Sequence, residues 1–306
     1  MYLRILSLFL FLTLAGSVPA QDSLHYYMNR GILTARLGDY PTAIGYFDKA
    51  LAFDSLKAEV WYNKGFARSE MGDREGAVSD LSRAIRLKPG YPEPWFIRAQ
   101  VKEQLNDLDG AIRDYSKALT LKAEYPEAYY NRGLVWMKKG ENMQAIMDFS
   151  RALQFQPRNA DILYHRGLAR FNENTYGSAV IDFNEAIKID PNQAIFFKSR
   201  GAAKASQKLY EEALQDFGAA LLLDPSDLET HHNKALALLY LARYHDAYKE
   251  YEAIMEKDPN DAEAWEGRGV ACQYLDDRRG ACRDWKKAVS LGSRKAASYL
   301  EKYCRP

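Results

Sequence analysis

Residues 126–159 read PEAYYNRGLVWMKKGENMQAIMDFSRALQFQPRN, and residues 160–193 follow with ADILYHRGLARFNENTYGSAVIDFNEAIKIDPNQ. Aligned end to end, the two stretches place Gly133 over Gly167 and Phe149 over Phe183, an offset of 34 residues. A fixed period of this length indicates repeated supersecondary units rather than one large globular core.

The same register extends in both directions through almost the whole chain. A small residue recurs every 34 positions, at Gly31, Gly65, Ala99, Gly133, Gly167, Gly201, Ala235 and Gly269. Twelve positions later comes an alanine, at Ala43, Ala77, Ala111, Ala145, Ala179, Ala213, Ala247 and Ala281. Four positions after it comes a large apolar residue, at Phe47, Leu81, Tyr115, Phe149, Phe183, Phe217, Tyr251 and Trp285. Spacings of three and four lie on one helical face, so each unit predicts two antiparallel helices that approach closely where the small residue meets the large one.

This pattern resembles the tetratricopeptide repeat, a helix-turn-helix unit of 34 residues. The resemblance implies an all-α fold, a right-handed superhelical solenoid with eight repeats over residues 24–295. The expected repeats are 24–57, 58–91, 92–125, 126–159, 160–193, 194–227, 228–261 and 262–295. Residues 296–306 are expected to form a C-terminal capping helix, because a repeat array must cover its last apolar face. The aromatic residue that the family usually has three positions after the small residue is replaced by a cation at Arg68, Lys102, Arg170 and Lys204.

The first twenty residues have a different composition from the repeats. Arg4 precedes an apolar run over 5–14, and small residues lead to Ala20. This pattern predicts a bacterial-type signal peptide over residues 1–20, cleaved before Gln21. The run is too short to span ~30 Å of hydrocarbon, and the lipobox-like stretch 14–17 lacks the cysteine that would be acylated. We therefore expect an exported protein, periplasmic or secreted, without a membrane span.

Composition and spacing argue against several function classes. The 42 Lys and Arg residues balance 41 Asp and Glu residues, which leaves no cationic excess to attract nucleic acid. The short connections leave no insertion that would form a lid, and no phosphate-binding glycine loop, nucleophile elbow or metal-ligand histidine spacing occurs. The adjacent residues His231 and His232 point in different directions on a helix. We predict no enzymatic activity, no cofactor and no metal site.

Charged residues also follow the repeat. A cation precedes each small residue, at Arg30, Lys64, Arg98, Arg132, Arg166, Arg200, Lys234 and Arg268. An acid precedes the second-helix aromatic or leucine in seven repeats, at Asp80, Asp114, Asp148, Asp182, Asp216, Glu250 and Asp284. These sets predict either an array of anion-binding groups or a repeated ion pair between the two helices, and the matched register favours the ion pair. Carboxylates in the first helical turn, such as Glu263, are interpreted as partners of the helix dipole.

The resemblance implies that the first helices line a concave, peptide-binding groove. The residues at the corresponding positions, concentrated in repeats 2–5, are Met28, Asn29, Tyr62, Asn63, Phe66, Phe96, Tyr130, Asn131, Leu134, Tyr164 and Phe171. Since the core positions are filled by the sets above, we expect this second stripe to be exposed, and an exposed apolar strip usually marks a binding site. Packing between repeats is the alternative interpretation.

The three cysteines raise the question of whether two of them form a disulfide. Cys272 and Cys282 are expected to lie opposite each other across the last hairpin, which would allow a disulfide in an oxidising compartment. The alternative is two buried thiols. Cys304 would be left free or would form an intermolecular bond.

These observations predict a non-enzymatic protein-protein interaction scaffold that binds an extended peptide or partner-protein segment, in envelope or secretion-related assembly. The alternative is a module that binds glycans or cell-wall fragments, because Tyr and Trp rings also stack on sugars. Self-association into a homo-oligomer is left open.

Overall fold

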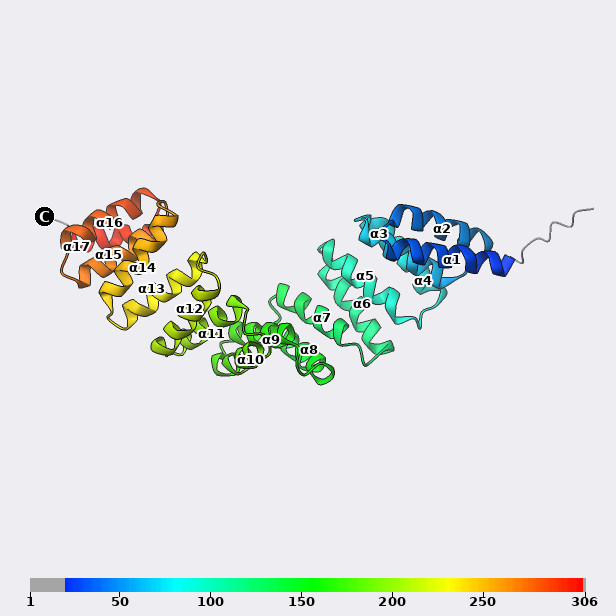
Figure 1. Cartoon of the computed structure of the whole chain (residues 1–306), viewed down its shortest axis with the longest axis horizontal. Coiled ribbons are helices and arrows are strands. Elements are labelled where there is room, and N and C mark those ends of the chain that lie inside the picture. Colours follow the sequence, from blue (N-terminus) through cyan, green and yellow to red (C-terminus); the bar gives the residue numbers. More distant parts are fainter. Residues whose placement is uncertain (1–19, 305–306) are drawn as a thin grey trace, which may run out of the picture. The chain divides into compact units, whose positions relative to one another are not determined.

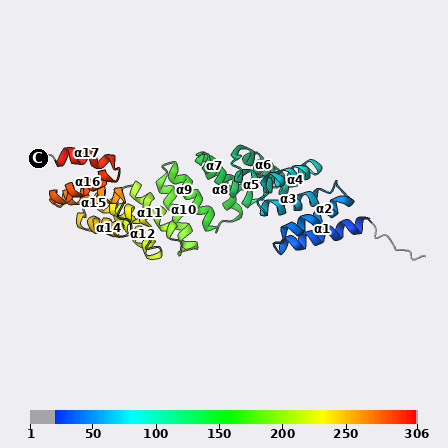
Figure 2. The same ribbon diagram turned by 90° about the horizontal axis from the view of Figure 1, so that it is seen from above.

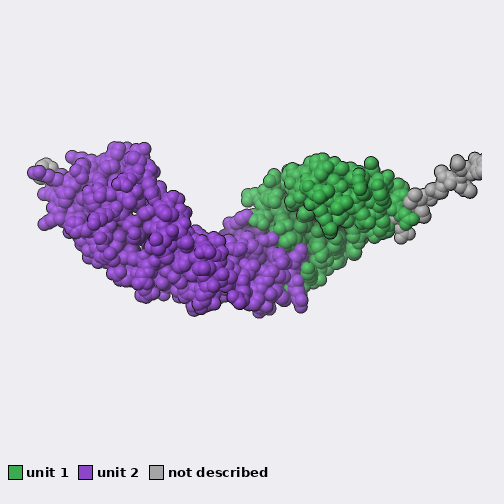
Figure 3. Space-filling view, viewed as in Figure 1, with its two compact units in different colours: residues 1–123 green, residues 124–306 purple. Residues whose placement is uncertain are grey.

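The computed structural model describes residues 20–304 of the chain. All regular structure in this range is helical, in seventeen α-helices joined by short turns (Figure 1). The expected all-α fold is therefore confirmed. The chain divides into two compact units, residues 1–123 and 124–306, each an all-α solenoid of stacked helical hairpins (Figure 3). The predicted signal peptide lies outside the described residues except for Ala20.

The N-terminal unit contains six helices. They are α1 (Ala20–Arg36), α2 (Tyr40–Phe53), α3 (Ala58–Glu70), α4 (Arg74–Leu87), α5 (Pro92–Gln104) and α6 (Leu108–Leu121). The C-terminal unit contains the other eleven. They are α7 (Pro126–Lys138), α8 (Asn142–Phe155), α9 (Ala160–Asn172), α10 (Tyr176–Ile189), α11 (Ala194–Ser206), α12 (Tyr210–Leu223), α13 (Leu228–Tyr240), α14 (Tyr244–Lys257), α15 (Ala262–Tyr274), α16 (Arg278–Ser290) and α17 (Arg294–Tyr303).

Consecutive helices pair into hairpins. The two helices of a pair, such as α3 with α4 or α15 with α16, make the most extensive contacts and lie side by side in both ribbon views (Figures 1 and 2). Within each unit, the second helix then packs on the first helix of the next pair. From α3 onward the first helices begin 34 residues apart, at Ala58, Pro92, Pro126, Ala160, Ala194, Leu228 and Ala262.

The core lies inside the hairpins, at the residues that the period selects. All eight recurring alanines of the second helices are fully buried. Gly167 shows why the first helix needs a small residue, because a Cβ there would lie 2.6 Å from Cε1 of Phe183. The predicted close approach of the two helices is confirmed.

The last helix, α17, covers the end of the C-terminal unit and begins two residues earlier than expected. The ring centroids of Tyr299 and Tyr303 lie 5.1 and 5.8 Å from that of Trp285 on α16. These rings cover the apolar face that the last hairpin would otherwise expose.

The turn inside each hairpin requires one residue with positive φ. In the described hairpins this position is held by Gly38, Gly72, Asn106, Gly140, Asn174, Lys208, Ala242 and Asp276. Glycine adopts this conformation freely, whereas a Cβ strains it. The exposed Ala242, with φ 58°, therefore carries strain that Gly140, with φ 78°, does not.

We expect Ala242→Gly to stabilise the α13–α14 hairpin by about 0.5–1 kcal/mol, because relief of the strained φ exceeds the extra entropy of glycine in the unfolded chain. Gly140→Ala should destabilise the α7–α8 hairpin by a similar amount. Hydrogen exchange of the flanking amides measures both changes. Equal signs for the two variants would contradict this explanation.

Candidate functional site

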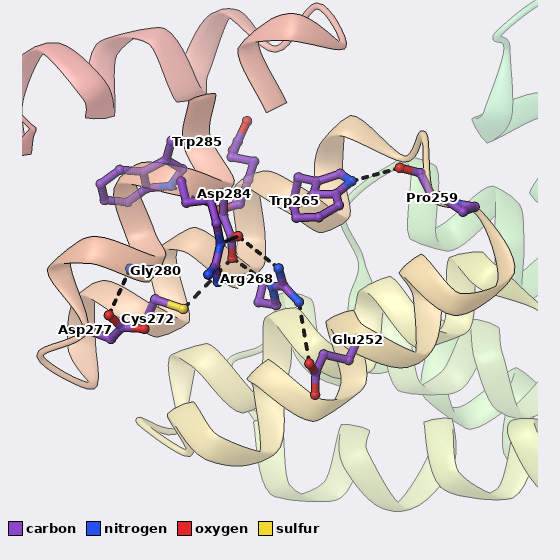
Figure 4. Close-up of polar contacts among 11 residues, drawn as sticks. Glu252, Pro259, Trp265, Arg268, Cys272, Asp277, Gly280, Asp284 and Trp285 are labelled. Atoms are coloured by element: carbon purple, nitrogen blue, oxygen red, sulfur yellow. Dashed lines mark hydrogen bonds and ion pairs between the residues drawn. The ribbon is translucent and has the colours of Figure 1, made fainter. Parts of the chain in front are cut away.

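The recurring cations are held in ion pairs inside the repeats. In repeat 8, Arg268 on α15 donates from Nε and Nη2 to the two carboxylate oxygens of Asp284 on α16, at 2.7 and 2.9 Å (Figure 4). The guanidinium also lies over the ring of Trp265, 4.8 Å from its centroid. Both Arg268 and Asp284 are buried. A bound anion would have to displace a buried carboxylate, so the ion-pair interpretation is confirmed here.

The same pairing recurs elsewhere in the two units. The equivalent pairs are Arg98–Asp114, Arg132–Asp148, Arg166–Asp182, Arg200–Asp216 and Lys234–Glu250. The cations that replace the family's usual aromatic residue reach the acid of the same repeat, in the pairs Arg68–Asp80, Lys102–Asp114, Arg170–Asp182 and Lys204–Asp216. The departure from the family pattern thus adds a second charge contact to a buried carboxylate.

Repeat 2 departs from this arrangement. Lys64 pairs with Asp48 of the preceding repeat at 2.7 Å, so the buried Asp80 has an ion pair only with Arg68, at 3.0 Å. Burial raises the pKa of Asp80 above its ordinary value of 3.8, more than the nearby cations lower it. The prediction that Lys64 pairs within its own repeat is corrected.

The cysteines pair differently from the expectation. Cys272 occupies the position where repeats 2, 3, 5 and 6 have the second cation, and its Sγ lies 4.0 Å from Oδ2 of Asp284 (Figure 4). Burial raises the pKa of this thiol to about 11. Cys282 is bonded to Cys304, with their Cα atoms 5.8 Å apart. The predicted Cys272–Cys282 bond is therefore wrong, because Cys272 faces into the hairpin while Cys282 faces the end of α17.

The predicted groove residues of the N-terminal unit differ in exposure. Asn29 is exposed, and the half-buried members are Met28, Tyr62, Asn63 and Phe66. Phe96 is only 9% exposed, with its ring edge against Tyr115 at 5.7 Å between centroids. It belongs to the core, which corrects its assignment as a ligand contact. Nδ2 of Asn63 donates to the carbonyl of Glu59 at 2.8 Å, so this amide is already engaged within its helix.

The predicted residues of the C-terminal unit are neither fully buried nor fully exposed. Tyr130, Asn131, Leu134, Tyr164 and Phe171 are half-buried. The hydroxyl of Tyr130 lies 3.2 Å from Nδ1 of His165, and burial raises the pKa of this tyrosine to about 12. The ring of Tyr164 lies 5.0 Å from that of Phe196 in the next repeat. Packing between repeats thus takes up much of this stripe.

A more exposed aromatic surface lies in repeats 6–8, which the sequence prediction did not include. Leu236, Tyr240 and Tyr274 are 46%, 62% and 63% exposed. Tyr240 stacks on Tyr210 with centroids 4.8 Å apart, and Tyr274 stacks on Tyr244 at 4.6 Å. We call the surface formed by α9, α11, α13 and α15 the first-helix face of the C-terminal unit.

Two pockets adjoin on the first-helix face and share Leu236 and Tyr240. The first, the apolar pocket, has a volume of 310 Å³ between α11 and α13 and is lined mainly by Phe171, Ala202, Ala205, Tyr210, Leu236 and Tyr240. The second, the tyrosine pocket, has a volume of 330 Å³ between α13 and α15. The tyrosines that line it are Tyr240, Tyr244, Tyr251, Tyr274 and Tyr299. Side chains of α17 complete its wall.

Some charged groups that line the tyrosine pocket have ion-pair partners and others do not. Glu266 pairs with Lys295 at 3.0 Å and accepts a hydrogen bond from Ser293 at 2.6 Å. The bond with Glu266 raises the pKa of Lys295. Nε2 of His232 lies 2.7 Å from Asp261. The remaining carboxylate, on the exposed Glu263, forms no ion pair with any residue from 20 to 304.

The sequence did contain a signal for this surface. Tyr176, Tyr210 and Tyr244 are spaced by 34 residues at the start of three second helices, and Tyr240 and Tyr274 are spaced by 34 at the end of two first helices. Recurrence of an aromatic residue outside the core register indicates a second use for that residue type.

A larger pocket of 480 Å³ lies along α12, α13 and α14, away from the tyrosines. Its charged lining is neutralised internally, because Lys234 pairs with Glu250 at 2.7 Å and Arg243 pairs with Asp246 at 2.8 Å. Four of the charged residues that line this pocket are therefore already paired with one another.

A membrane-spanning helix and a metal-binding cluster are both absent from residues 20–304. No helix there combines the length and apolar character that crossing a membrane requires. No group of three or more His, Cys, Asp or Glu side chains in this range is arranged to hold a metal ion.

Comparison with protein families identifies the repeat. Family models described as "TPR repeat" and "Tetratricopeptide repeat" match residues 102–140 and 126–159 respectively. Two further tetratricopeptide repeat models match residues 232–272, and 58–91 with 160–193. Together these matches cover more than half of the chain. The sequence has no significant match among curated proteins.

Solved structures share the fold at low sequence identity. A tetratricopeptide repeat protein from Parabacteroides merdae is 20% identical with a TM-score of 0.59, and the match covers 81% of this chain and 99% of that one. YrrB, described as a TPR protein with an unusual peptide-binding site, is 22% identical with a TM-score of 0.55, over 61% and 97% of the chains. MamA from Desulfovibrio magneticus is 22% identical with a TM-score of 0.53, over 56% and 97%.

Proposed function

Because the chain belongs to the tetratricopeptide repeat family, we propose that it is a non-enzymatic scaffold that binds an extended peptide or a partner-protein segment on the first-helix face of its C-terminal unit. The observation that carries this proposal is the pair of adjoining pockets with Leu236 and Tyr240 exposed between them. Single exposed apolar residues are ordinary, whereas a contiguous strip set in pockets marks binding sites. Tyrosine rings also supply contact area with few rotors to freeze.

The earlier expectation placed the ligand over repeats 2–5. Tyr62, Phe66 and Leu134 are half-buried and remain predicted secondary contacts. The exposed tyrosines of repeats 7 and 8 support main ligand contacts in those repeats instead of in repeats 2–5. The peptide-binding site named in the description of YrrB supports a peptide ligand for this chain.

A photo-crosslinking amino acid at Leu236 tests the proposal in native cells. Leu222, which is 86% exposed on α12 and lines neither pocket, is the matched control. We expect a discrete protein adduct from position 236 and none from position 222. Equal adducts at both positions, or adducts with cell-wall fragments alone, would exclude the proposed protein ligand.

Single variants Tyr240→Ala and Tyr274→Ala should each weaken binding of that adduct partner by roughly tenfold, since tyrosines at an interface commonly contribute more than 1 kcal/mol. Tyr26→Ala is the control, because Tyr26 is similarly exposed at 58% but lies on α1 in the other unit. Titration calorimetry with the purified partner measures all three. Unchanged affinity for the first two variants would remove them from the site.

We further propose that the protein acts outside the cytoplasm in an envelope or secretion-related assembly. The leader-like residues 1–20 and the Cys282–Cys304 disulfide support this location, because such bonds persist in oxidising compartments. We expect N-terminal sequencing of the native protein to begin at Gln21 and the periplasmic or secreted fraction to contain it. An uncleaved chain in the cytosol would contradict this location.

A further inference from the structure

Basic residues are concentrated at one end of a chain that is nearly neutral as a whole. Residues 278–306 carry nine Lys and Arg against two Asp and Glu, whereas residues 1–277 carry 33 against 39. The basic stretch contains α16 and the cap helix α17. Charge asymmetry of this kind is typical of proteins that bind an anionic surface, and the balanced total charge does not reveal it.

Four of these cations share one face of α16. We call them the cationic stripe, and they are Arg279, Arg283, Lys286 and Lys287. Their spacings of four, three and one residues place them within an arc of about 100° on the helix. All four are exposed, whereas Trp285 on the opposite face is buried in the hairpin. Because α16 packs on α15 and α17, the stripe is left facing solvent.

The carboxylates nearest the stripe are engaged elsewhere. Asp284 is buried and holds the arginine of α15, and Asp277 accepts a hydrogen bond from a backbone N–H at the start of α16. Nε of Arg283 lies 3.4 Å from Asp284, but 67% of the arginine side chain stays exposed. Ion pairs with residues 20–304 are absent for Arg279, Lys286 and Lys287.

The first cation of the stripe does not stabilise the helix that carries it. Arg279 lies in the first turn of α16, where the helix dipole favours a negative charge. The same position of α4, α6 and α12 is acidic, with Glu75, Asp109 and Glu211. Arginine at this position therefore opposes the dipole that the acids of the other repeats complement.

The rest of the stripe also departs from what the repeat requires. In five other repeats the position of Lys286 holds an oxygen that contacts the cation of the next repeat, on Asp48, Ser82, Ser150, Asn184 and Glu252. A lysine cannot accept such a bond. Like charges four residues apart, as at Arg279 with Arg283, further destabilise a helix. Because packing does not explain these cations, a ligand of opposite charge does.

A row of cations on an outer helix face suits an extended anionic surface. None of the three pockets described above is lined by a residue of α16. A layer of phosphate headgroups can contact all four cations at once, and each basic residue near an anionic bilayer strengthens binding by about fivefold. The leader-like residues 1–20 and the disulfide, which support a location outside the cytoplasm, favour phospholipid over nucleic acid.

We propose that the cationic stripe of α16 docks the C-terminal unit on an anionic phospholipid bilayer through the phosphates of the headgroups. The contact is electrostatic and peripheral, because the apolar face of α16 is buried in the hairpin. It goes beyond the proposed peptide-binding function and uses no residue of the first-helix face. The proposed location outside the cytoplasm enters only in the choice of lipid over nucleic acid.

Co-sedimentation of the full chain with vesicles tests the proposal. One set of vesicles is phosphatidylcholine alone, and the other is an equimolar mixture of phosphatidylcholine with phosphatidylglycerol. We expect binding to the anionic vesicles only, and loss of that binding at high salt, because salt screens exposed charges. Equal binding to both sets, or no binding to the anionic set at low salt, overturns the proposal.

Register-matched variants show whether the stripe makes the contact. The double variant Arg283→Gln, Lys287→Gln should weaken partition onto anionic vesicles roughly thirtyfold, which is about 1 kcal/mol for each cation. The control is Arg113→Gln, Lys117→Gln, which removes the same charge from exposed residues at the same two positions of α6. It should leave binding nearly unchanged. Equal weakening by both double variants would mean that total charge binds the vesicles, and it would overturn the proposal.

A second pair keeps the test independent of folding. Arg279→Gln, Lys286→Gln removes two cations that have no ion pair among the described residues, so it should weaken vesicle binding as much as the first pair. Both pairs on α16 should keep or raise the melting temperature followed by circular dichroism, because they remove like-charge contacts. Undiminished vesicle binding by this second pair would exclude the stripe.

Other polyanions and the crosslink at position 236 separate the remaining outcomes. If the full chain binds duplex DNA or a polyglutamate peptide more tightly than anionic vesicles at the same salt, the lipid assignment is wrong. If position 236 crosslinks a protein partner while vesicles do not bind, the docking proposal fails and the scaffold function stands. If the stripe binds vesicles but position 236 gives no adduct, the scaffold function fails and the docking proposal stands.

Discussion

Asp114→Asn is expected to destabilise the N-terminal unit by about 3–5 kcal/mol, the cost of removing one partner from a buried charge cluster. Asp114 is 3% exposed and accepts hydrogen bonds from Nε and Nη2 of Arg98 at 2.7 and 2.8 Å. Lys102 lies 2.8 Å from the same carboxylate. The amide would leave two largely buried cations without a counter-charge, a penalty far above that of a surface ion pair.

Asp80→Asn is the matched control for this prediction. Asp80 occupies the equivalent position one repeat earlier and is also buried, but its neighbours Lys64 and Arg68 each have another acid within 4 Å, Asp48 and Asp73 respectively. Removing the charge of Asp80 therefore leaves no cation without an acidic partner. We expect a change within about 1 kcal/mol.

The pKa of Asp80 gives the sign of that small change. Because burial raises its folded-state pKa above 3.8, the folded chain holds the Asp80 proton more tightly than the unfolded chain does. The contribution of Asp80 to the free energy of unfolding therefore falls as the pH rises from 3.8 to the folded-state pKa. Above the folded-state pKa it stays at the lower value. Asp80→Asn should thus be neutral or slightly stabilising at pH 7, and its advantage should vanish below pH 3.8.

Hydrogen exchange of the full chain measures both variants without assuming a two-state transition, which long repeat arrays need not obey. Amides of α5 and α6 should exchange roughly a hundredfold to a few thousandfold faster in Asp114→Asn. Those of α3 and α4 should be nearly unchanged in Asp80→Asn. Equal acceleration in the two variants would show that leaving Arg98 and Lys102 without a counter-charge costs nothing.

The period of 34 predicted the hairpins because the residues that recur at this spacing are the ones that pack inside each hairpin. The residues that meet inside a hairpin, such as Gly167 and Phe183, are constrained in every repeat, so the pattern is visible in one sequence. The ion pairs were predictable for the same reason. Lys64 was the exception, because the register of one repeat does not exclude a partner such as Asp48 in the repeat before it.

The candidate site was harder to predict, because register does not determine exposure. Phe96 and Tyr164 stand at the same position of their repeats, yet Phe96 is buried against Tyr115 and Tyr164 is half-buried beside Phe196. What covers each residue depends on the neighbouring repeat. The exposed tyrosines of repeats 7 and 8 recur only twice, too few times to stand out from the core period.

Cys304→Ser is expected to free α17 from the last hairpin, at a cost of about 3 kcal/mol. Cys282 and Cys304 are 22 residues apart, and a bond that closes a loop of this size lowers the entropy of the unfolded chain by about that much. The remaining contacts of α17 include the rings packed on Trp285, the Lys295–Glu266 ion pair and a hydrogen bond from Nε of Arg278 to the carbonyl of Tyr303, at 2.9 Å. With the bond removed, the ten-residue helix is held mainly by these contacts.

The loosened helix should affect ligand binding as well as stability, because α17 contributes Lys295 and Tyr299 to the wall of the tyrosine pocket. In Cys304→Ser we expect amides of α17 to exchange roughly a hundredfold faster, and the partner crosslinked at position 236 to bind more weakly. A reductant should give wild-type protein the same phenotype and leave the variant unchanged. Cys272→Ser is the matched control, because Cys272 lies inside the hairpin and takes no part in the bond. If the reductant acts equally on wild type and Cys304→Ser, the disulfide is not what holds the cap in place.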